Sequence, residues 1–289
     1  MVYILHASMA YFGAAIVIDL GASIILIRGG GDLATGVAVR LFRSGFPLVI
    51  TELPQPLMVR RTVSFGEAVN EGRMEVEGIK AALADDIETA EGLLLSRGAE
   101  RLIPVVVDPG ALCRERLRPL VVVDAIMAKR NTGTRLTDAP LVVALGPGFS
   151  AGRDCHVVVE TNRGHCLGRA IYDGAAEPDT GMPGDVGGKT VERILRSPCD
   201  GAVEGAVEIG EQVHSGQLVA TVGGQEVRAR IDGVLRGLIR PGSRVNRGLK
   251  IGDIDPRAKR GHCFLVSDKS LAIGGGVLEA VMAFLARRG

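Results

Sequence analysis

A glycine-rich turn near the start of the chain sets the strongest limit on its fold. The turn follows a β-branched run at residues 23–27 and precedes residues 33–45, whose apolar side chains recur at helical spacing as far as Gly45. Residues 46–52 then show a second strand pattern. A strand, a helix and a strand in this order predict an α/β fold with a Rossmann-like, mainly parallel sheet.

The turn itself matches a dinucleotide-binding fingerprint. Gly29, Gly31 and Ala34 follow the GxGxxA pattern, and Glu52 ends the second strand about 20 residues later, where an acid that binds ribose belongs. Glycine lets the backbone approach a phosphate, and the helix N-terminus behind it offers free N–H groups. The residues expected to bind a nucleotide are Gly29, Gly30, Gly31, Asp32, Thr35, Gly36 and Glu52.

An alternative reading of the turn stays open. Asp32 is a natural helix N-cap, so the glycines could serve packing alone. The Asp32 carboxylate also repels a phosphate unless it points away or holds a cation.

Further strand patterns end at Asp108 and Asp124, with helical patterns near residues 86–97 and 111–117. Ligands of open parallel sheets bind beyond the carboxyl ends of the strands. Arg28, Glu52, Asp108 and Asp124 fall at such ends and are candidates for ligand contact, although helix caps and loop salt bridges are the commoner roles of such residues.

Residues 154–166 hold a dense group of reactive side chains. If residues 155–160 are extended, His156 and Glu160 share one face, and Cys155 lies on the other. His156 and Glu160 could then act as a base and its orienter, and imidazolium near a thiol would activate it. The candidate catalytic residues are Cys155, His156, Glu160 and His165; buried cysteines and hydrogen-bonded loop histidines are the alternative. Neither the CxxC nor the HExxH spacing occurs, so no metal site is predicted.

An internal repeat is the clearest sign of a second unit. Residues 200–222 align with residues 232–254, with glycines and a valine at matching positions. Short strands joined by glycine turns predict two interlocked β units, an all-β barrel-sandwich (hammerhead-like) module formed by the repeat. The spacing resembles that of biotinyl and lipoyl carrier domains, but the turn at residues 222–227 has no lysine, so covalent biotin or lipoate is not expected.

These patterns divide the 289 residues into four parts. Residues 1–22 are apolar but begin without Lys or Arg after Met1, which favours an N-terminal extension, such as a misassigned start, over an export signal. Residues 23–196 form the Rossmann-like α/β domain and residues 197–256 the repeat module. Residues 257–289 contribute a strand near 263–267, a polar turn with Asp268 and Lys269, and a helix after Gly274–Gly276 that packs back on the α/β domain. The glycines could equally form another anion site at the helix N-terminus or serve this packing alone.

Charge and cysteine content narrow the partners and the compartment. The formal net charge of +1 gives no broad basic surface, so neither nucleic acid nor a membrane is an expected partner. The five cysteines fit reduced thiols in a cytoplasm better than a disulfide framework.

Taken together, several stretches from about Ser23 to the end resemble one bacterial family. They include "IRGGGDLATG", "TELPQPLMVRRTVSF", "ALGPGFSAGRDCHVVVETNRGH", "KIGDIDPR" and "SDKSLAIGGGVLEA". The chain resembles the accessory proteins of the selenium-dependent molybdenum hydroxylase system (YqeB family). The resemblance implies a cytoplasmic protein whose partner is a molybdenum hydroxylase apoenzyme of the xanthine dehydrogenase type, or another maturation factor.

Three functions remain open from the sequence. The leading one is a maturation factor that binds a nucleotide or the dinucleotide form of the molybdenum cofactor on the glycine turn. The second is a docking protein without catalysis, in which residues 197–256 grip the hydroxylase. The third is an NAD-dependent dehydrogenase, since Glu52 suits a ribose hydroxyl and repels a 2′-phosphate. Whether the chain is itself an enzyme stays open.

Overall fold

The computed structural model describes residues 23–95 and 101–288, and its largest element is a nine-stranded sheet. The central strands are rich in β-branched residues and are buried on both faces. In spatial order the strands are β10 (Ala170–Ile171), β9 (Val157–Val159), β7 (Leu141–Leu145), β6 (Val121–Asp124), β1 (Ile25–Arg28), β2 (Leu48–Glu52), β5 (Ile103–Val107), β4 (Ile79–Ala84) and β3 (Arg73–Val76).

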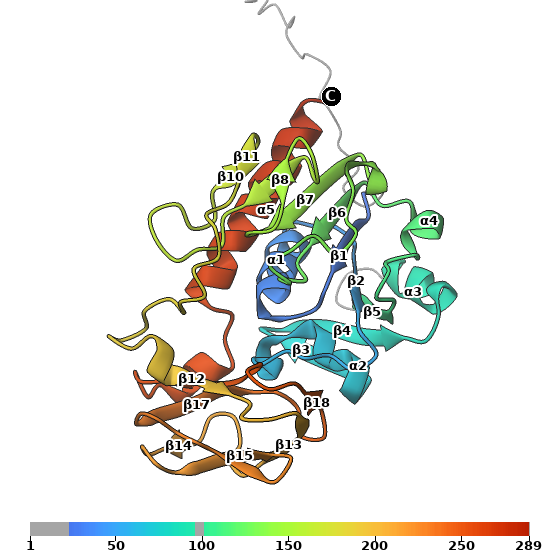
Figure 1. The fold of residues 1–289 in the computed structure, drawn as a ribbon. Helices are drawn as coiled ribbons and strands as arrows, with labels where there is room; N and C mark the ends of the chain where they lie inside the picture. Colours follow the sequence, from blue (N-terminus) through green and yellow to red (C-terminus); the bar gives the residue numbers. More distant parts are fainter. Residues whose placement is uncertain (1–22, 96–100, 289) are drawn as a thin grey trace, which may run out of the picture.

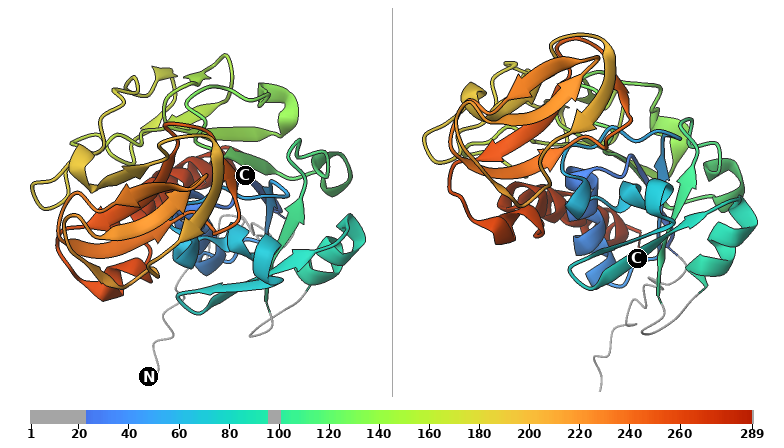
Figure 2. Two further views of the ribbon diagram at one scale, coloured as in Figure 1. Left: turned by 60° about the horizontal axis from the view of Figure 1, so that its bottom comes forward. Right: turned by 90° about the horizontal axis from the view of Figure 1, so that it is seen from below.

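Helices cover both faces of this sheet. The α-helices are α1 (Asp32–Arg43), α2 (Ala68–Glu71), α3 (Ile87–Leu94), α4 (Arg114–Leu117) and α5 (Asp268–Ala286), and short 3-10 turns occur at Arg61–Val63, Phe65–Glu67, Leu136–Asp138, Val191–Arg193 and Arg260–Cys263. One apolar core joins α1 and α5 to the sheet, and a second core joins α3 and α4 to its other face. The large-sheet part is therefore a three-layer sandwich (Figures 1 and 2).

The long helix α5 packs closely along α1 (Figure 1). A Cβ at Gly274 would lie 2.5 Å from the Gly36 carbonyl oxygen, and a Cβ at Gly276 would collide with the Gly168 carbonyl. The glycines predicted before the helix thus lie inside it and permit close contact. By length and composition alone α5 could cross a membrane, and 44% of its most apolar window is buried against the rest of the protein.

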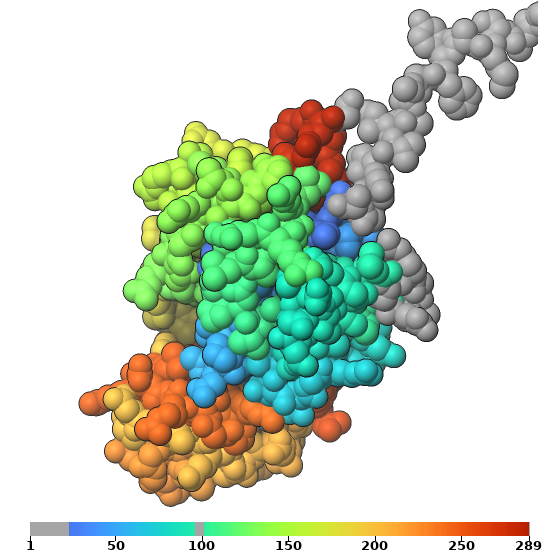
Figure 3. All heavy atoms as spheres, turned by 90° about the vertical axis from the view of Figure 1, so that its right-hand side faces the viewer, coloured from blue at the N-terminus to red at the C-terminus, as the bar shows by residue number. Residues whose placement is uncertain are grey.

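The repeat region forms two four-stranded antiparallel sheets that stand as a lobe beside the large sheet (Figure 3). One contains β12 (Ile194–Arg196), β19 (Lys250–Asp255), β17 (Gly233–Leu238) and β14 (Gln212–Val213); the other contains β16 (Gln225–Arg228), β15 (Leu218–Val222), β13 (Gly201–Gly205) and β18 (Arg244–Val245). The short strand of each copy pairs within the sheet of the other copy. A further two-stranded sheet joins β8 (Ser150–Ala151) to β11 (Gly174–Ala175).

The predicted fold class is wrong. The large sheet is mixed, because β10 and β3 pair antiparallel at its two edges. Positive φ angles at Glu77 and Gly78 turn residues 73–84 into a hairpin, so β4 and β3 extend the sheet beyond β5 although they precede β5 in the chain. The repeat does not pair a barrel-sandwich module with a Rossmann-like sheet; it forms two separate antiparallel sheets, each completed by a strand, β12 or β16, that the repeat alignment does not contain.

The strand predicted at residues 263–267 is also wrong. The backbone carbonyls around this segment accept hydrogen bonds from the side chains of another loop and not from a neighbouring strand. Arg60 Nη2 donates to the carbonyls of His262 and Leu265, and Thr62 Oγ1 donates to the Cys263 carbonyl at 2.7 Å. The boundaries predicted at residues 196 and 256 stay predictions, and the extension at residues 1–22 lies outside the described residues.

Candidate functional site

A cavity of about 340 Å³ opens at the carboxyl ends of β1, β2, β5 and β6, where open α/β sheets bind their ligands. The glycine turn and the first turn of α1 form one wall of this crevice. The loop after β2 and residues that follow β5 and β6 form the others. The lining comprises residues 28–33, 51–53, 57–59, 108–109 and 125–127.

Two of the three turn glycines have different structural roles. Gly31 has a φ of −69°, and a Cβ there would meet no atom within 4 Å, so the space above it is open. Gly30 is closely packed, because a Cβ there would lie 2.6 Å from the Gly66 Cα. Gly31, Asp32 and Leu33 therefore present the start of α1 to the crevice.

The other two residues predicted on this helix lie in packed regions. The Thr35 side chain is buried, and its Oγ1 accepts a hydrogen bond from the Phe65 N–H at 2.9 Å. A Cβ at Gly36 would collide with the Ser270 carbonyl of α5. Both residues hold neighbouring segments against α1, and neither lines the crevice.

Glu52 lines the crevice but already serves the glycine turn. Its Oε2 accepts the Gly30 N–H at 2.7 Å and its Oε1 accepts the Leu53 N–H at 2.7 Å. Burial raises the pKa of this carboxyl, and the two backbone hydrogen bonds oppose that shift. Glu52, the residue predicted to bind ribose, thus orders the glycine turn, and its carboxylate keeps further lone pairs that could accept a hydrogen bond.

Asp32 forms an ion pair with a buried arginine. The Arg60 Nη1 atom lies 3.5 Å from Asp32 Oδ2, and the Arg60 side chain is buried. The Arg60 charge offsets part of the repulsion that Asp32 would exert on an anion.

The acidic residues predicted at the strand ends are engaged by the fold. Asp124 Oδ2 accepts hydrogen bonds from Thr134 Oγ1 at 2.5 Å and from Arg28 Nη1 at 3.3 Å, within the protein interior. Asp108 Oδ2 accepts the Cys113 N–H at 2.7 Å ahead of α4. Asp108 and Arg28 also line the crevice.

A larger cavity of about 590 Å³ adjoins the crevice, between the large sheet and the repeat lobe. Asp32, Leu33, Val59 and Met127 line both cavities. Eight basic side chains line the larger one, against four carboxylates. We call it the basic cavity.

The predicted catalytic cluster is not gathered in one place. Cys155 is fully buried in the core on the sheet face that α3 and α4 cover, and burial raises the pKa of its thiol to about 12. The thiol is therefore protonated at neutral pH. The strand runs only from Val157 to Val159, so the six-residue extension assumed for the cluster is wrong.

His156 and Glu160 flank that strand at opposite ends. His156 Nδ1 accepts the Val142 N–H at 2.9 Å near the amino end, and burial lowers the pKa of the imidazole. Glu160 is buried past the carboxyl end, where its oxygens accept the N–H groups of Thr161, at 2.7 Å, and of two other loop residues. They do not form a base and its orienter, and His165 lies exposed in the following turn.

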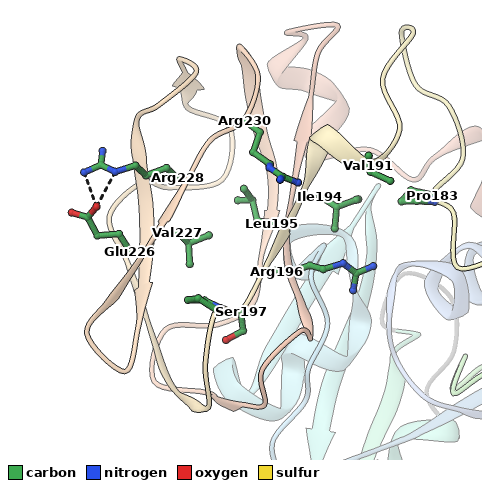
Figure 4. Close-up of a pocket in the computed structure, with 11 residues that line it drawn as sticks. Pro183, Val191, Ile194, Leu195, Arg196, Ser197, Glu226, Val227, Arg228 and Arg230 are labelled. Carbon is green, nitrogen blue, oxygen red and sulfur yellow. Dashed lines mark hydrogen bonds and ion pairs between the residues drawn. The ribbon is translucent and has the colours of Figure 1, made fainter.

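Two other possibilities for a site can be assessed from the structure. Within residues 23–95 and 101–288, no three His, Cys, Asp or Glu side chains are grouped so that they could hold a metal ion. A third cavity, of about 390 Å³, lies between β12 and β16 (Figure 4). There Glu226 and Arg228 pair with each other at 2.8 Å, while the Arg196 side chain points away from them.

The basic cavity was not predicted from the sequence. Five of its eight cations come from the loop after β2 (Arg60), from the chain before β12 (Arg193), from the repeat lobe (Arg236, Lys250) and from the start of α5 (Lys269); the others are Lys129, Arg163 and Arg196. Their sequence spacing shows no pattern, and only the fold brings them to one surface.

Comparison with known sequences finds a curated relative of this chain. No protein-family model matches the chain. The chain is 48% identical over 265 residues to the uncharacterized protein YqeB of Escherichia coli (strain K12), an alignment that covers 92% of this chain and 48% of that protein. The chain thus spans about half the length of the curated relative it matches.

Three solved structures show a partial likeness to this chain. An aspartoacylase family protein from Mesorhizobium loti matches with 14% identity and a TM-score of 0.25, over 80% of this chain and 84% of that one. A succinylglutamate desuccinylase from Silicibacter sp. TM1040 matches with 16% identity and a TM-score of 0.24, over 80% and 84%. The product-bound ectoine utilization protein EutE (DoeB) from Ruegeria pomeroyi matches with 15% identity and a TM-score of 0.23, over 80% and 84%. These TM-scores are too low to establish a shared fold.

Proposed function

We propose that this protein binds a nucleotide, or a cofactor in dinucleotide form, in the crevice at the start of α1. The observation that carries the proposal is the open space above Gly31, at the carboxyl ends of four parallel strands. Here the first N–H groups of a twelve-residue helix face the cavity, with the positive end of its dipole.

The sequence resemblance supplies the biological role of this proposal. The protein is a cytoplasmic accessory factor in the maturation of a selenium-dependent molybdenum hydroxylase, and its partner is the apoenzyme or another maturation factor. The ligand is then the dinucleotide form of the molybdenum cofactor or a nucleotide used in making it. Neither the maturation role nor selenium handling follows from the geometry.

The residues of the crevice fit such a ligand in two respects. Gly31 leaves room for a phosphate at the helix start, and buried Arg60 has an Nη1 atom without a hydrogen bond at the boundary with the basic cavity. The backbone N–H groups of Gly31, Asp32 and Leu33 would hold the phosphates, with Glu52 keeping the turn in place. A bound molybdenum cofactor supplies redox chemistry to the hydroxylase, while this chain binds and orients it.

A thermal-shift panel tests the proposal. The ligands are CTP, ATP, NAD and molybdopterin cytosine dinucleotide, and the variants are Gly31→Val and the matched control Gly92→Val on the exposed side of α3. A ligand at about 100 times its Kd stabilises by about 2.7 kcal/mol, which raises Tm by several degrees. We expect a shift with CTP or the cofactor that Gly31→Val abolishes and Gly92→Val retains. A shift in Tm with NAD alone favours a dehydrogenase. If no ligand shifts the Tm, the proposal is contradicted, and the docking protein without catalysis becomes the favoured function.

A further inference from the structure

The basic cavity contains buried cationic groups whose hydrogen-bonding capacity is not used. Arg60, Arg193 and Arg236 are each at least nine-tenths buried. The Nε atoms of all three and the Nη1 atom of Arg60 are buried without a hydrogen-bond partner. These four atoms are covered by protein, so the three side chains bring mainly their positive charge to the cavity wall, and their free donors reach a ligand only when the side chains turn toward it.

Carboxylates compensate only part of this positive charge. Arg193 pairs with Asp253, and Arg236 has Asp255 at 3.9 Å, but Asp255 pairs more closely with Arg257, at 2.6 Å. The cavity's other three paired cations, Arg60, Lys129 and Arg163, form ion pairs with Asp32, Asp179 and Asp268.

Two lysines of the cavity remain uncompensated. Across residues 23–95 and 101–288, no ion pair or hydrogen bond joins Lys250 or Lys269 to a carboxylate. Burial lowers the pKa of both ammonium groups, and the Lys250 charge adds to that shift at Lys269. Two partly buried lysines that face the same cavity without partners are energetically costly, and a bound anion would remove that cost.

We infer that the basic cavity is a binding site for a phosphate or diphosphate group, with Lys250 and Lys269 as its principal charges and buried Arg60 and Arg236 as its hydrogen-bond donors. A phosphate group carries about −1.5 to −2 charges at pH 7, which matches two unpaired lysines. It also offers several acceptor oxygens to planar guanidinium forks. The 590 Å³ volume exceeds that of a lone ion, so the phosphate belongs to a larger molecule.

The proposed phosphate site lies next to the crevice, because the two cavities share lining residues. Because Asp32, Leu33, Val59 and Met127 line both cavities, one ligand can extend from the start of α1 to Lys250. The phosphate site itself does not depend on the proposed nucleotide binding, because its two principal charges, Lys250 and Lys269, belong to the repeat lobe and to α5.

Isothermal titration with inorganic pyrophosphate, phosphate and citrate tests the inference on the full chain. The variants are Lys250→Met and Lys269→Met, alone and together, since methionine keeps the unbranched stem and removes the charge. Lys80→Met, an exposed lysine on β4, is the matched control. We expect wild type, Lys80→Met and Gly31→Val to bind pyrophosphate, and the double variant to bind about 30-fold more weakly or not at all.

Each other outcome contradicts the inference. It is overturned if wild type does not bind pyrophosphate at millimolar concentration, or if a folded double variant binds as wild type does. Citrate binding more tightly than pyrophosphate would overturn the phosphate assignment. Gly31→Val separates the two proposals. If this variant loses nucleotide binding and keeps pyrophosphate binding, both proposals are supported. If wild type binds none of the nucleotides but still binds pyrophosphate, only the proposed nucleotide site is contradicted.

Discussion

Arg60 and Asp32 meet where the crevice joins the basic cavity, with Arg60 Nη1 3.5 Å from Asp32 Oδ2. Asp32 is the first residue of α1 and lines both cavities. In the binding proposed above, the Asp32 carboxylate would repel an incoming phosphate, and the Arg60 charge would offset part of that repulsion.

This pair predicts that Asp32→Asn increases affinity for pyrophosphate. The substitution removes a charge that repels the ligand and frees Arg60, and about 1 kcal/mol of relief near a protein surface corresponds to a several-fold lower Kd. Loss of a first-turn acid costs α1 about 0.3–1 kcal/mol, so the variant should fold. Titration against Asp85→Asn, an exposed control, measures the effect, and weaker binding by Asp32→Asn would contradict it.

The helix pair α1 and α5 predicts a contrast between neighbouring glycines. Gly274→Ala forces a Cβ to within 2.5 Å of the Gly36 carbonyl and should destabilise by about 1–3 kcal/mol. Gly275→Ala meets no atom within 4 Å and should be neutral, or stabilise by up to about 1 kcal/mol through helix propensity. Urea unfolding of both variants measures the difference, and equal stabilities would argue against close packing at this contact.

His156 predicts a pH dependence of stability. Its Nδ1 accepts the Val142 N–H, and burial lowers the pKa of the folded imidazole. The unfolded chain therefore binds more protons below about pH 6.5, so this contribution is complete above that pH and is lost as the pH falls. His156→Asn keeps an acceptor but does not titrate. The unfolding free energy of wild type relative to this variant should fall between pH 7.5 and 5, and a constant difference would contradict the account.

Cys155 predicts a lack of thiol reactivity in the folded protein. Because the side chain is fully buried and its thiol has a pKa of about 12, iodoacetamide at pH 7.5 should leave Cys155 unmodified until the protein unfolds. Half-buried Cys166 is the internal comparison. Peptide mass spectrometry before and after denaturation reads both sites. Rapid labelling of folded Cys155 would restore the case for a catalytic thiolate.

Local patterns predicted local structure well. The strand, helix and strand expected over residues 23–52 are present as β1, α1 and β2, since apolar periodicity and a glycine turn act within a short segment. The hairpin at Glu77 and Gly78 changed the sheet order, and its positive φ angles have no signature as strong as Asn-Gly.

The site depended on tertiary contacts that periodicity does not encode. Gly31 and Glu52 belong to one βαβ unit and could be assigned to the crevice from the sequence. In the same motif, however, Thr35 accepts a hydrogen bond from Phe65 and Gly36 packs against α5. Lys250 and Lys269 line the same cavity only because the fold brings the repeat lobe beside the start of α5.

The most direct test of nucleotide binding is the position of a bound ligand's phosphates in a crystal of the full chain soaked with CTP. The account predicts phosphate density at the N-terminus of α1 above Gly31, extending toward Lys250 and Lys269. Density for CTP only in the cavity between β12 and β16, or elsewhere on the surface with the crevice free of ligand, would contradict it.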